Sequence, residues 1–176
     1  MIKVLFICHG SICRSPMAKY IMTDLVEKAG YGDEFLIDSA ATSSEELGNP
    51  VYPPARAILK SHGIDCDGYA ARRMRFEDYE EYDLIIGMDS ENMYYMRRMW
   101  KEDPEGKLRL LLDYSKSPRE VSDPWYTRDF ETAYNDILEG CTCLLSAIKQ
   151  NGPRGRSRGV ISKKNGPSTP SPGTIL

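Results

Sequence analysis

Four short apolar runs divide the chain and predict four buried β-strands. They are rich in branched side chains, as strands covered on both faces usually are, and they lie at residues 4–7, 35–37, 83–88 and 108–112. Helical periodicity between and after these runs predicts helices over residues 16–29, 55–62, 76–82, 92–100 and 129–149. Strands that alternate with helices indicate an α/β fold with a parallel sheet and right-handed crossovers.

Two of these helices have apolar faces that predict packing against the core. The face of the last helix consists of Phe130, Ala133, Tyr134, Ile137, Leu138, Cys141, Leu145 and Ile148. Cys141 and Cys143 are two residues apart and cannot share a helix face, so we expect one to be buried and the other to point outward. Two cysteines are also too few for a metal site. In the preceding helix, Met93, Met96 and Trp100 fit a core face better than a cofactor site.

The segment 8–15 joins the first strand to the first helix. Ser15 suits the N-cap of that helix and Pro16 its first position, and Gly10 permits backbone angles that other residues resist. Open α/β sheets bind ligands at such strand-to-helix junctions, where unpaired N–H groups and the helix dipole favour an anion. The sequence therefore predicts an anion-binding loop.

Cys8 and Arg14 give this loop its chemistry. The N–H groups of the loop would stabilise a thiolate at Cys8, and a guanidinium binds two phosphate oxygens at once. The Ser15 hydroxyl can donate to the thiolate or cap the helix. A nucleophile and a guanidinium around one oxyanion predict phosphoryl transfer. The alternative is a buried structural cysteine beside a surface arginine.

Asp123 is the candidate proton donor for this reaction. It follows the fourth strand, so the parallel topology places it at the same sheet edge as Cys8. Pro124 stiffens the backbone next to its carboxyl group, which suits a general acid; the alternative is that Ser-Asp-Pro is only a helix-entry turn. Trp125 and Tyr126 could then form the walls of a narrow cleft that binds a flat aromatic leaving group.

Composition places the chain among ordinary globular proteins. It has 176 residues, 41% hydrophobic and 28% charged, and it contains neither the ~20-residue apolar run of a membrane span nor a signal-peptide pattern. Five cysteines, an odd number, argue against a disulfide scaffold. We therefore expect the reducing cytoplasm and no membrane insertion.

The charge of −3 is distributed unevenly. Residues 151–176 are rich in Gly, Pro and Ser, lack periodicity, and are predicted to form a disordered basic tail. The basic residues of this tail are Arg154, Arg156, Arg158, Lys163 and Lys164. The predicted domain, residues 1–150, has 18 basic and 26 acidic residues, a net charge of −8, which is a poor surface for nucleic acid.

With these residues in place, the chain resembles the low-molecular-weight protein tyrosine phosphatases. The resemblance covers residues 1 to about 150 and rests on six segments in the family's order: 8–16, 38–43, 48–50, 62–64, 87–89 and 123–126. It implies a single-domain, flavodoxin-like sheet of four parallel strands with helices on both faces, and no metal or organic cofactor. It also implies phosphotyrosine-containing proteins, including a tyrosine kinase, as partners of a monomer or weak dimer.

By this resemblance, Cys8 attacks phosphorus, Arg14 binds the equatorial oxygens and Asp123 protonates the leaving tyrosine. Asp123 then activates the water that hydrolyses the phosphocysteine, and Ser15 assists the departing sulfur. Cys13 matches a second loop cysteine that forms a protective disulfide with the nucleophile. The implied phosphate-binding loop is His9, Gly10, Ser11, Ile12, Cys13, Arg14 and Ser15.

The sequence departs from the family at three positions. Ser11 replaces the usual Asn, and Gly68-Tyr69 stands where members have a His; in the family these two side chains, with serines matching Ser15 and Ser39, brace the loop. We expect a rebuilt network in which Ser11 bonds directly to Ser15 or Ser39. Glu45 lies near the position of an aromatic residue in many members, so one wall of the substrate cleft is changed.

Three alternative functions remain open. Arsenate reductases share the fold and loop, but they need relay cysteines, and residues 67–140 contain none. Related protein-arginine phosphatases have Thr at the position of Ile12, and the hydrocarbon of Ile12 suits a phenyl ring instead. A non-catalytic phosphate-binding protein would not need Cys8, Arg14 and Asp123 together.

Overall fold

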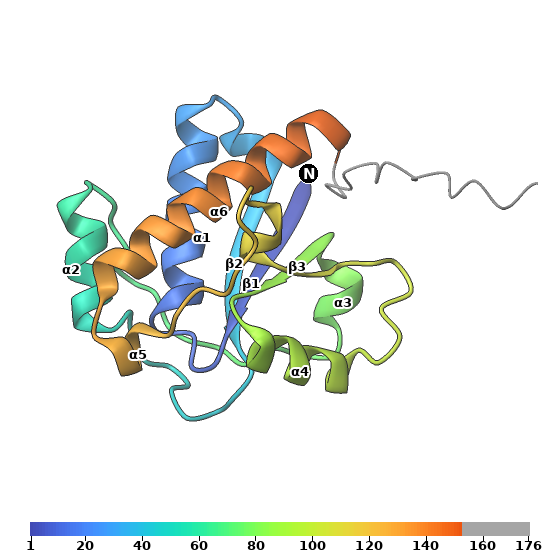
Figure 1. Ribbon diagram of the computed structural model, residues 1–176, viewed down its shortest axis with the longest axis horizontal. Coiled ribbons are helices and arrows are strands. Elements are labelled where there is room, and N and C mark those ends of the chain that lie inside the picture. The colour runs from blue at the N-terminus through green and yellow to red at the C-terminus, as the bar shows by residue number, and fades with distance from the viewer. Residues whose placement is uncertain (153–176) are drawn as a thin grey trace, which may run out of the picture.

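Four parallel strands form the centre of the computed structural model, which describes residues 1–152 (Figure 1). The strands are β1 (Ile2–Cys8), β2 (Phe35–Ala41), β3 (Leu84–Gly87) and β4 (Leu108–Leu110). Their order is β2-β1-β3-β4, which confirms the predicted flavodoxin-like sheet. The order reverses between β1 and β3, the position at which open sheets of this kind bind ligands.

Helices cover both faces of the sheet (Figure 1). They are α1 (Arg14–Lys28), α2 (Pro53–Ser61), α3 (Asp78–Glu81), α4 (Ser90–Met99), α5 (Pro124–Thr127) and α6 (Phe130–Asn151), with short 3₁₀ turns η1 (Gly32–Glu34) and η2 (Leu111–Tyr114). Residues of α1, α2 and α6 share one apolar core, whereas α3 and α4 contribute to the other.

The alternation of side chains along β1 separates these two cores. Val4 and Phe6 pack with α1 and α6, and Leu5 and Ile7 pack with Met96 of α4. These four side chains of β1 are fully buried, because a strand covered on both faces has no solvent side. This explains why the sequence of β1 is continuously apolar rather than alternating.

The first helix begins earlier than the sequence predicts. Its N-cap is Cys13 rather than Ser15, and Arg14 is already helical. The Ser15 hydroxyl contacts Cys8 and Ser11 instead of a free helix N–H, so the prediction that Ser15 caps the helix is wrong.

Other boundaries differ at the ends of strands. β2 continues to Ala41 because Ala41 exchanges backbone hydrogen bonds with the segment 72–74. β4 ends at Leu110, and Leu111–Tyr114 turn into η2. These shifts lie within the usual uncertainty of helix and strand ends.

The core predictions for the helices are confirmed. Cys141 is fully buried and Cys143 is partly exposed, and Met96 and Trp100 lie in the core. No helix among residues 1–152 is long and apolar enough to cross a membrane. Of the predicted tail, residues 153–176 lie outside the described part of the chain.

Gly140 of α6 packs directly against Leu111 of η2. A Cβ atom on Gly140 would lie 2.5 Å from Cγ of Leu111, which is fully buried. We expect Gly140→Ala to lower the free energy of unfolding by about 1–2 kcal/mol, because overpacking of about 1–3 kcal/mol outweighs the gain in helix propensity of about 1 kcal/mol. Urea denaturation measures this, with the exposed Ser146→Ala as control; a variant as stable as the parent contradicts it.

Candidate active site

The loop after β1 is arranged to bind an anion. Three of its carbonyl groups accept hydrogen bonds from neighbouring segments. The carbonyl of Cys8 accepts the N–H of Thr42 at 3.0 Å, and that of His9 accepts the N–H of Ser43 at 3.1 Å. The carbonyl of Ile12 accepts the N–H of Tyr52 at 2.8 Å. Within residues 1–152, the backbone N–H groups of residues 9–13 find no protein acceptor. These N–H groups are therefore available to a bound anion.

Cys8 stands at the start of this loop with its thiol next to α1. Its side chain is buried, and its Sγ accepts the N–H of Ser15 at 3.4 Å. The Ser15 hydroxyl lies 3.2 Å from the same sulfur, close enough to donate to it when the thiol ionises. The first turn of α1 thus supplies two donors to one sulfur atom.

Arg14 is almost completely buried and is held by three acceptors. Its Nη1 donates to Oδ2 of Asp89 at 2.6 Å and to the carbonyl of Val121 at 2.8 Å, while Nη2 lies 3.4 Å from Oδ2 of Asp123. Burial disfavours its charged form, but the negative charges of Cys8, Asp89 and Asp123 raise the pKa of Arg14. The guanidinium is therefore charged and fixed in one orientation.

Asp89 contacts Arg14, although it was not among the candidate site residues predicted from the sequence. It caps α4: its Oδ1 accepts the N–H of Asn92 at 2.8 Å, and the side chain of Asn92 completes a capping box. Its other oxygen holds Arg14. The signal was its place directly after β3, which brings it to the same sheet edge as Cys8.

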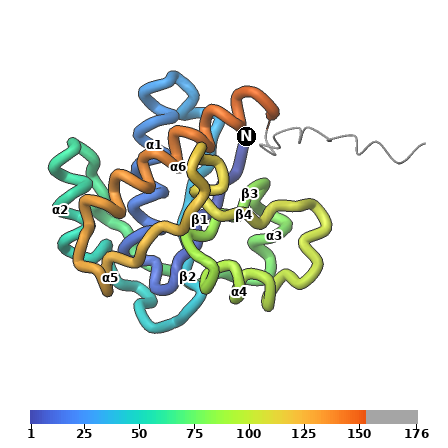
Figure 2. Tube along the Cα trace, viewed as in Figure 1, coloured from blue at the N-terminus to red at the C-terminus, as the bar shows by residue number. Residues whose placement is uncertain are grey.

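Asp123 forms the helix-entry turn, and its carboxyl group also lines the cleft that contains Cys8. Its Oδ1 accepts the N–H of Trp125 at 3.0 Å and caps α5, while Oδ2 faces Arg14. The helix-entry turn thus fixes the carboxyl group at the site. Figure 2 shows α5 at the same end of the molecule as the loops that follow β1 and β2.

These groups surround one cleft of about 130 Å³. Ile12 lies in its wall, Trp125 is 42% exposed and Tyr126 is 83% exposed. The ring of Tyr52 supports Trp125 from behind, with ring centroids 5.0 Å apart. The remaining lining residues are Cys8, His9, Gly10, Cys13, Arg14, Glu45, Glu46 and Asp123. The structure therefore brings together all the predicted catalytic and cleft residues.

The backbone angle that needs special support is at Ser11, not at Gly10 as the sequence suggested. Ser11 has φ = 55°, in the left-handed region that side chains rarely adopt. Gly10 instead makes room for a neighbour, because a Cβ there would lie 3.1 Å from Cγ of Glu46. The strained residue of the loop must be held by its surroundings.

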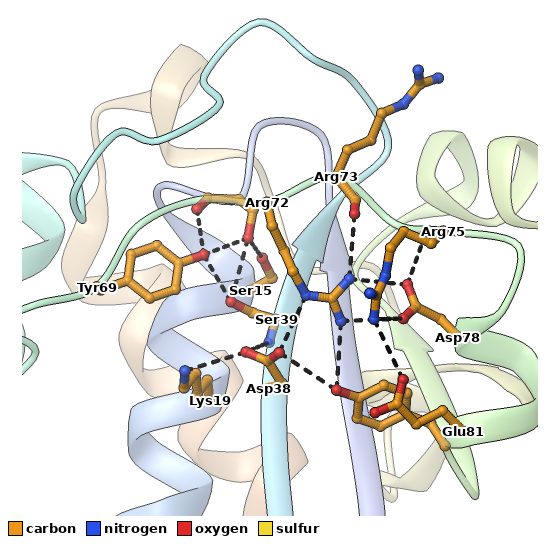
Figure 3. Close-up of polar contacts among 12 residues, drawn as sticks. Ser15, Lys19, Asp38, Ser39, Tyr69, Arg72, Arg73, Arg75, Asp78 and Glu81 are labelled. Carbon is orange, nitrogen blue, oxygen red and sulfur yellow. Dashed lines mark hydrogen bonds and ion pairs between the residues drawn. The ribbon is translucent and has the colours of Figure 1, made fainter.

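A buried network of hydroxyl groups holds Ser11. Its Oγ lies 2.9 Å from that of Ser15 and 3.3 Å from that of Ser39, so the expected direct bonds are present. The sequence did not predict the third contact, 2.6 Å to the hydroxyl of Tyr69. Tyr69 also donates to the carbonyl of Ser11 at 2.7 Å and lies 2.8 Å from Oγ of Ser39 (Figure 3).

Tyr69 is itself fixed by its setting. Burial raises the pKa of Tyr69 to about 12, so its hydroxyl keeps the proton that it donates. Shortly after it in the chain, Arg72 lies between Asp38 and Asp78, with nitrogen–oxygen distances of 3.2 and 3.0 Å (Figure 3). Because Asp38 immediately precedes Ser39 on β2, this ion-pair network ties the segment with Tyr69 to the strand that supports the loop.

We expect Tyr69→Phe to lower kcat/KM for an aryl phosphate about tenfold and stability by about 1–2 kcal/mol, since it leaves the Ser11 carbonyl buried without its donor. A purely structural role would change stability alone, so the affinity for inorganic phosphate is measured as well and should fall. Tyr20→Phe is the control, because Tyr20 packs edge-on against Tyr69 without joining the network. Unchanged phosphate affinity would contradict the role of Tyr69.

Cys13 lies in the wall of the same cleft as Cys8. Burial and the negative charges of Cys8 and Asp123 raise the pKa of Cys13 to about 12, so it is a thiol at neutral pH. All five cysteines are free. Within residues 1–152, no group of His, Cys, Asp and Glu side chains could hold a metal ion.

Comparison with known proteins gives a consistent picture. A family model described as low molecular weight phosphotyrosine protein phosphatase matches residues 3–154. The Bacillus subtilis low molecular weight protein-tyrosine-phosphatase YfkJ is 40% identical over 152 residues, covering 85% of this chain and 97% of the relative. The human low molecular weight phosphotyrosine protein phosphatase is 35% identical over 148 residues, covering 81% and 93%.

Solved structures agree in fold. The crystal structure of Bacillus subtilis YfkJ superposes with a TM-score of 0.83 and covers 85% of this chain and 96% of that one. A Drosophila arginine phosphatase, 31% identical, superposes with a TM-score of 0.79 and covers 85% and 99%. Fold and site together define an α/β enzyme with a cysteine at an anion-binding loop. The chain belongs to the low molecular weight phosphotyrosine protein phosphatase family.

Proposed function

We propose that this protein hydrolyses phosphotyrosine in proteins, and small aryl phosphates, through a phosphocysteine intermediate. The observation that carries the proposal is the convergence of Cys8, Arg14 and Asp123 on one cleft with an aromatic wall. A nucleophile, an oxyanion-binding guanidinium and a proton donor are the three groups that the reaction needs.

In the first step, the thiolate of Cys8 attacks phosphorus as the bond from phosphorus to the phenolic oxygen breaks. Arg14 and the loop N–H groups bind the three equatorial oxygens, where negative charge is spread in the transition state. The protonated carboxyl of Asp123 gives its proton to the departing phenolate. The products are phosphocysteine and tyrosine.

In the second step, the carboxylate of Asp123 takes a proton from water, which attacks the phosphocysteine. The phosphorus–sulfur bond breaks, its electron pair returns to Cys8, and inorganic phosphate leaves. Ser15 stabilises the departing thiolate by donating a hydrogen bond, as its position beside Sγ supports. No metal ion or organic cofactor is needed for either step.

We assign Cys13 as the resolving thiol for Cys8. After a peroxide converts Cys8 to a sulfenic acid, the sulfur of Cys13 would displace water and form a disulfide. The position of both cysteines in one cleft supports this pairing. Five free cysteines support a reducing compartment such as the cytoplasm, and the proposed partners are phosphotyrosine proteins, a tyrosine kinase among them, acted on by a monomer or weak dimer.

Phosphoarginine is the second candidate substrate, since the Drosophila arginine phosphatase is similar over nearly its whole length. The cleft favours phosphotyrosine, because Ile12 offers only hydrocarbon to the bound group and Trp125 can stack on a phenyl ring. Arsenate reduction would need relay cysteines, and residues 67–140 have none.

A side-by-side assay of a phosphotyrosine peptide, a phosphoarginine peptide and arsenate tests the proposal. We expect kcat/KM for phosphotyrosine to exceed that for phosphoarginine at least tenfold, and arsenate not to be reduced. Ile12→Thr is the matched variant, and it should bring the ratio of kcat/KM for the phosphotyrosine peptide to that for the phosphoarginine peptide closer to one. A parent enzyme that prefers phosphoarginine would overturn the assignment.

A further inference from the structure

The cleft is lined by two kinds of side chain. Trp125 and Tyr126 are aromatic, whereas Glu45 and Glu46 of the loop after β2 are acidic. We define the acidic rim as Glu45 and Glu46 together with Glu91 of α4. Glu45 and Glu46 line the cleft, and Glu91 lies beside His9 of the phosphate-binding loop, with 3.5 Å between its Oε1 and Nδ1 of His9.

The acidic rim is only partly neutralised. A single imidazole, His9, lies between two of its carboxylates, with Nε2 3.0 Å from Glu45 and Nδ1 facing Glu91. The side chains of Glu45 and Glu91 are 69% and 64% exposed, so both can still contact a ligand. Within the described residues, the carboxylate of Glu46 accepts a hydrogen bond from the uncharged amide of Asn49 and forms no ion pair.

Three arginines lie near the rim, and among residues 1–152 none of them forms an ion pair with its carboxylates. Arg73 donates its Nε to the carbonyl of Thr42 at 3.3 Å instead. Arg14 is buried at the floor of the cleft and already faces Asp89 and Asp123. Arg128 lies 5.4 Å from the ring of Trp125 and donates to the hydroxyl of Tyr52. A phosphorylated substrate, itself a dianion, must therefore pass a rim of the same sign.

We propose that the enzyme selects phosphotyrosines flanked by Lys or Arg. This inference rests on the proposed function. The phosphate binds at Arg14, the tyrosine ring lies along Trp125, and a neighbouring cationic side chain of the substrate binds at Glu45 and Glu91. That cation offsets the repulsion between the rim and the phosphate, whereas acidic flanking residues add to the repulsion.

The position of the rim makes it a specificity determinant rather than a distant patch. His9 belongs to the phosphate-binding loop and lines the cleft, so the carboxylates of Glu45 and Glu91, which contact His9, lie at the edge of the site. A side chain of lysine or arginine next to phosphotyrosine is long enough to reach them. Its effect should depend on ionic strength, because both carboxylates are exposed to solvent.

Three phosphotyrosine peptides of equal length, flanked by Lys, Gln or Glu, test this proposal. At low salt we expect kcat/KM for the Lys-flanked peptide to exceed that for the Glu-flanked peptide about tenfold, and 0.5 M salt should reduce this ratio severalfold. The double variant Glu45→Gln/Glu91→Gln should lower the low-salt ratio to about twofold. The control Glu34→Gln/Glu102→Gln removes two exposed carboxylates elsewhere and should leave it unchanged.

The outcomes separate this inference from the proposed function. Equal rates for the three peptides, a preference for Glu flanks, or an equal loss of the ratio in the control variant would overturn the selection of basic flanks while phosphotyrosine hydrolysis stands. Hydrolysis of phosphoarginine but of none of the phosphotyrosine peptides would overturn both. The readout is the ratio of kcat/KM for two peptides measured on the same variant. A change in activity that affects both peptides equally leaves this ratio unchanged.

Discussion

Cys8→Ser is expected to abolish turnover of phosphotyrosine and aryl phosphates, with a loss of about 10⁴-fold or more. The serine hydroxyl keeps its proton at neutral pH, so no anionic nucleophile is present, and Ser15 donates its hydrogen bond to a much poorer attacking group. The anion-binding groups remain: Arg14 with its three acceptors and the loop N–H groups. Steady-state kinetics measures the loss.

Phosphate binding shows whether the variant has lost only its nucleophile or also the ability of the loop to bind an anion. The Cys8→Ser variant should bind inorganic phosphate with an affinity near that of the parent in isothermal titration calorimetry. Cys143→Ser, which changes a partly exposed cysteine of α6, is the matched control and should retain full activity. A Cys8→Ser variant that retains turnover within tenfold of the parent would show that another group attacks phosphorus.

The features that the sequence predicted well follow from burial and topology. Residues such as Phe6 and Ile7 must be apolar because β1 is covered on both faces. Parallel strands then bring the residues at and beyond their carboxyl ends to one edge, so Cys8 and Asp123 line one cleft although they are far apart in sequence. This topological argument was available without coordinates, and it located the catalytic candidates.

The support of the loop could not be predicted in the same way. The bond between Tyr69 and Ser11 joins residues 58 positions apart, and Tyr69 lies in an irregular segment with no periodicity to indicate its direction. The backbone strain at Ser11 also has no sequence signal, since Gly10 is the residue whose type suggests a positive φ. The absence of the family's His indicated that the hydrogen-bond network around the loop is changed. Only the packed structure shows that a tyrosine hydroxyl joins this network.

Asp123→Asn is expected to slow the first step most for substrates whose leaving group is a strong base. For phosphotyrosine, whose phenol has a pKa of about 10, removal of the proton donor should cost about 10²–10⁴-fold. For p-nitrophenyl phosphate the leaving phenolate is stable without protonation, so the loss should be much smaller. Asparagine keeps an oxygen to accept the N–H of Trp125 and cap α5, so the turn is preserved.

The second step provides an independent readout for the same residue. With p-nitrophenyl phosphate, Asp123→Asn should form phosphocysteine quickly and hydrolyse it slowly, because the base for water is also lost. A burst of nitrophenol close to one per enzyme should then appear in stopped-flow traces. The control is Asp129→Asn, which changes another helix N-cap, that of α6, and should keep parent kinetics.

The dependence on the leaving group separates proton transfer from charge balance at Arg14. Asp123 also lies 3.4 Å from the guanidinium, so its substitution leaves Arg14 with one carboxylate fewer and changes phosphate binding for every substrate alike. Loss of a general acid instead steepens the dependence of the rate on leaving-group basicity. An equal loss for all aryl phosphates, without a burst, would therefore mean that Asp123 acts only by positioning Arg14, and that the proton comes from another group.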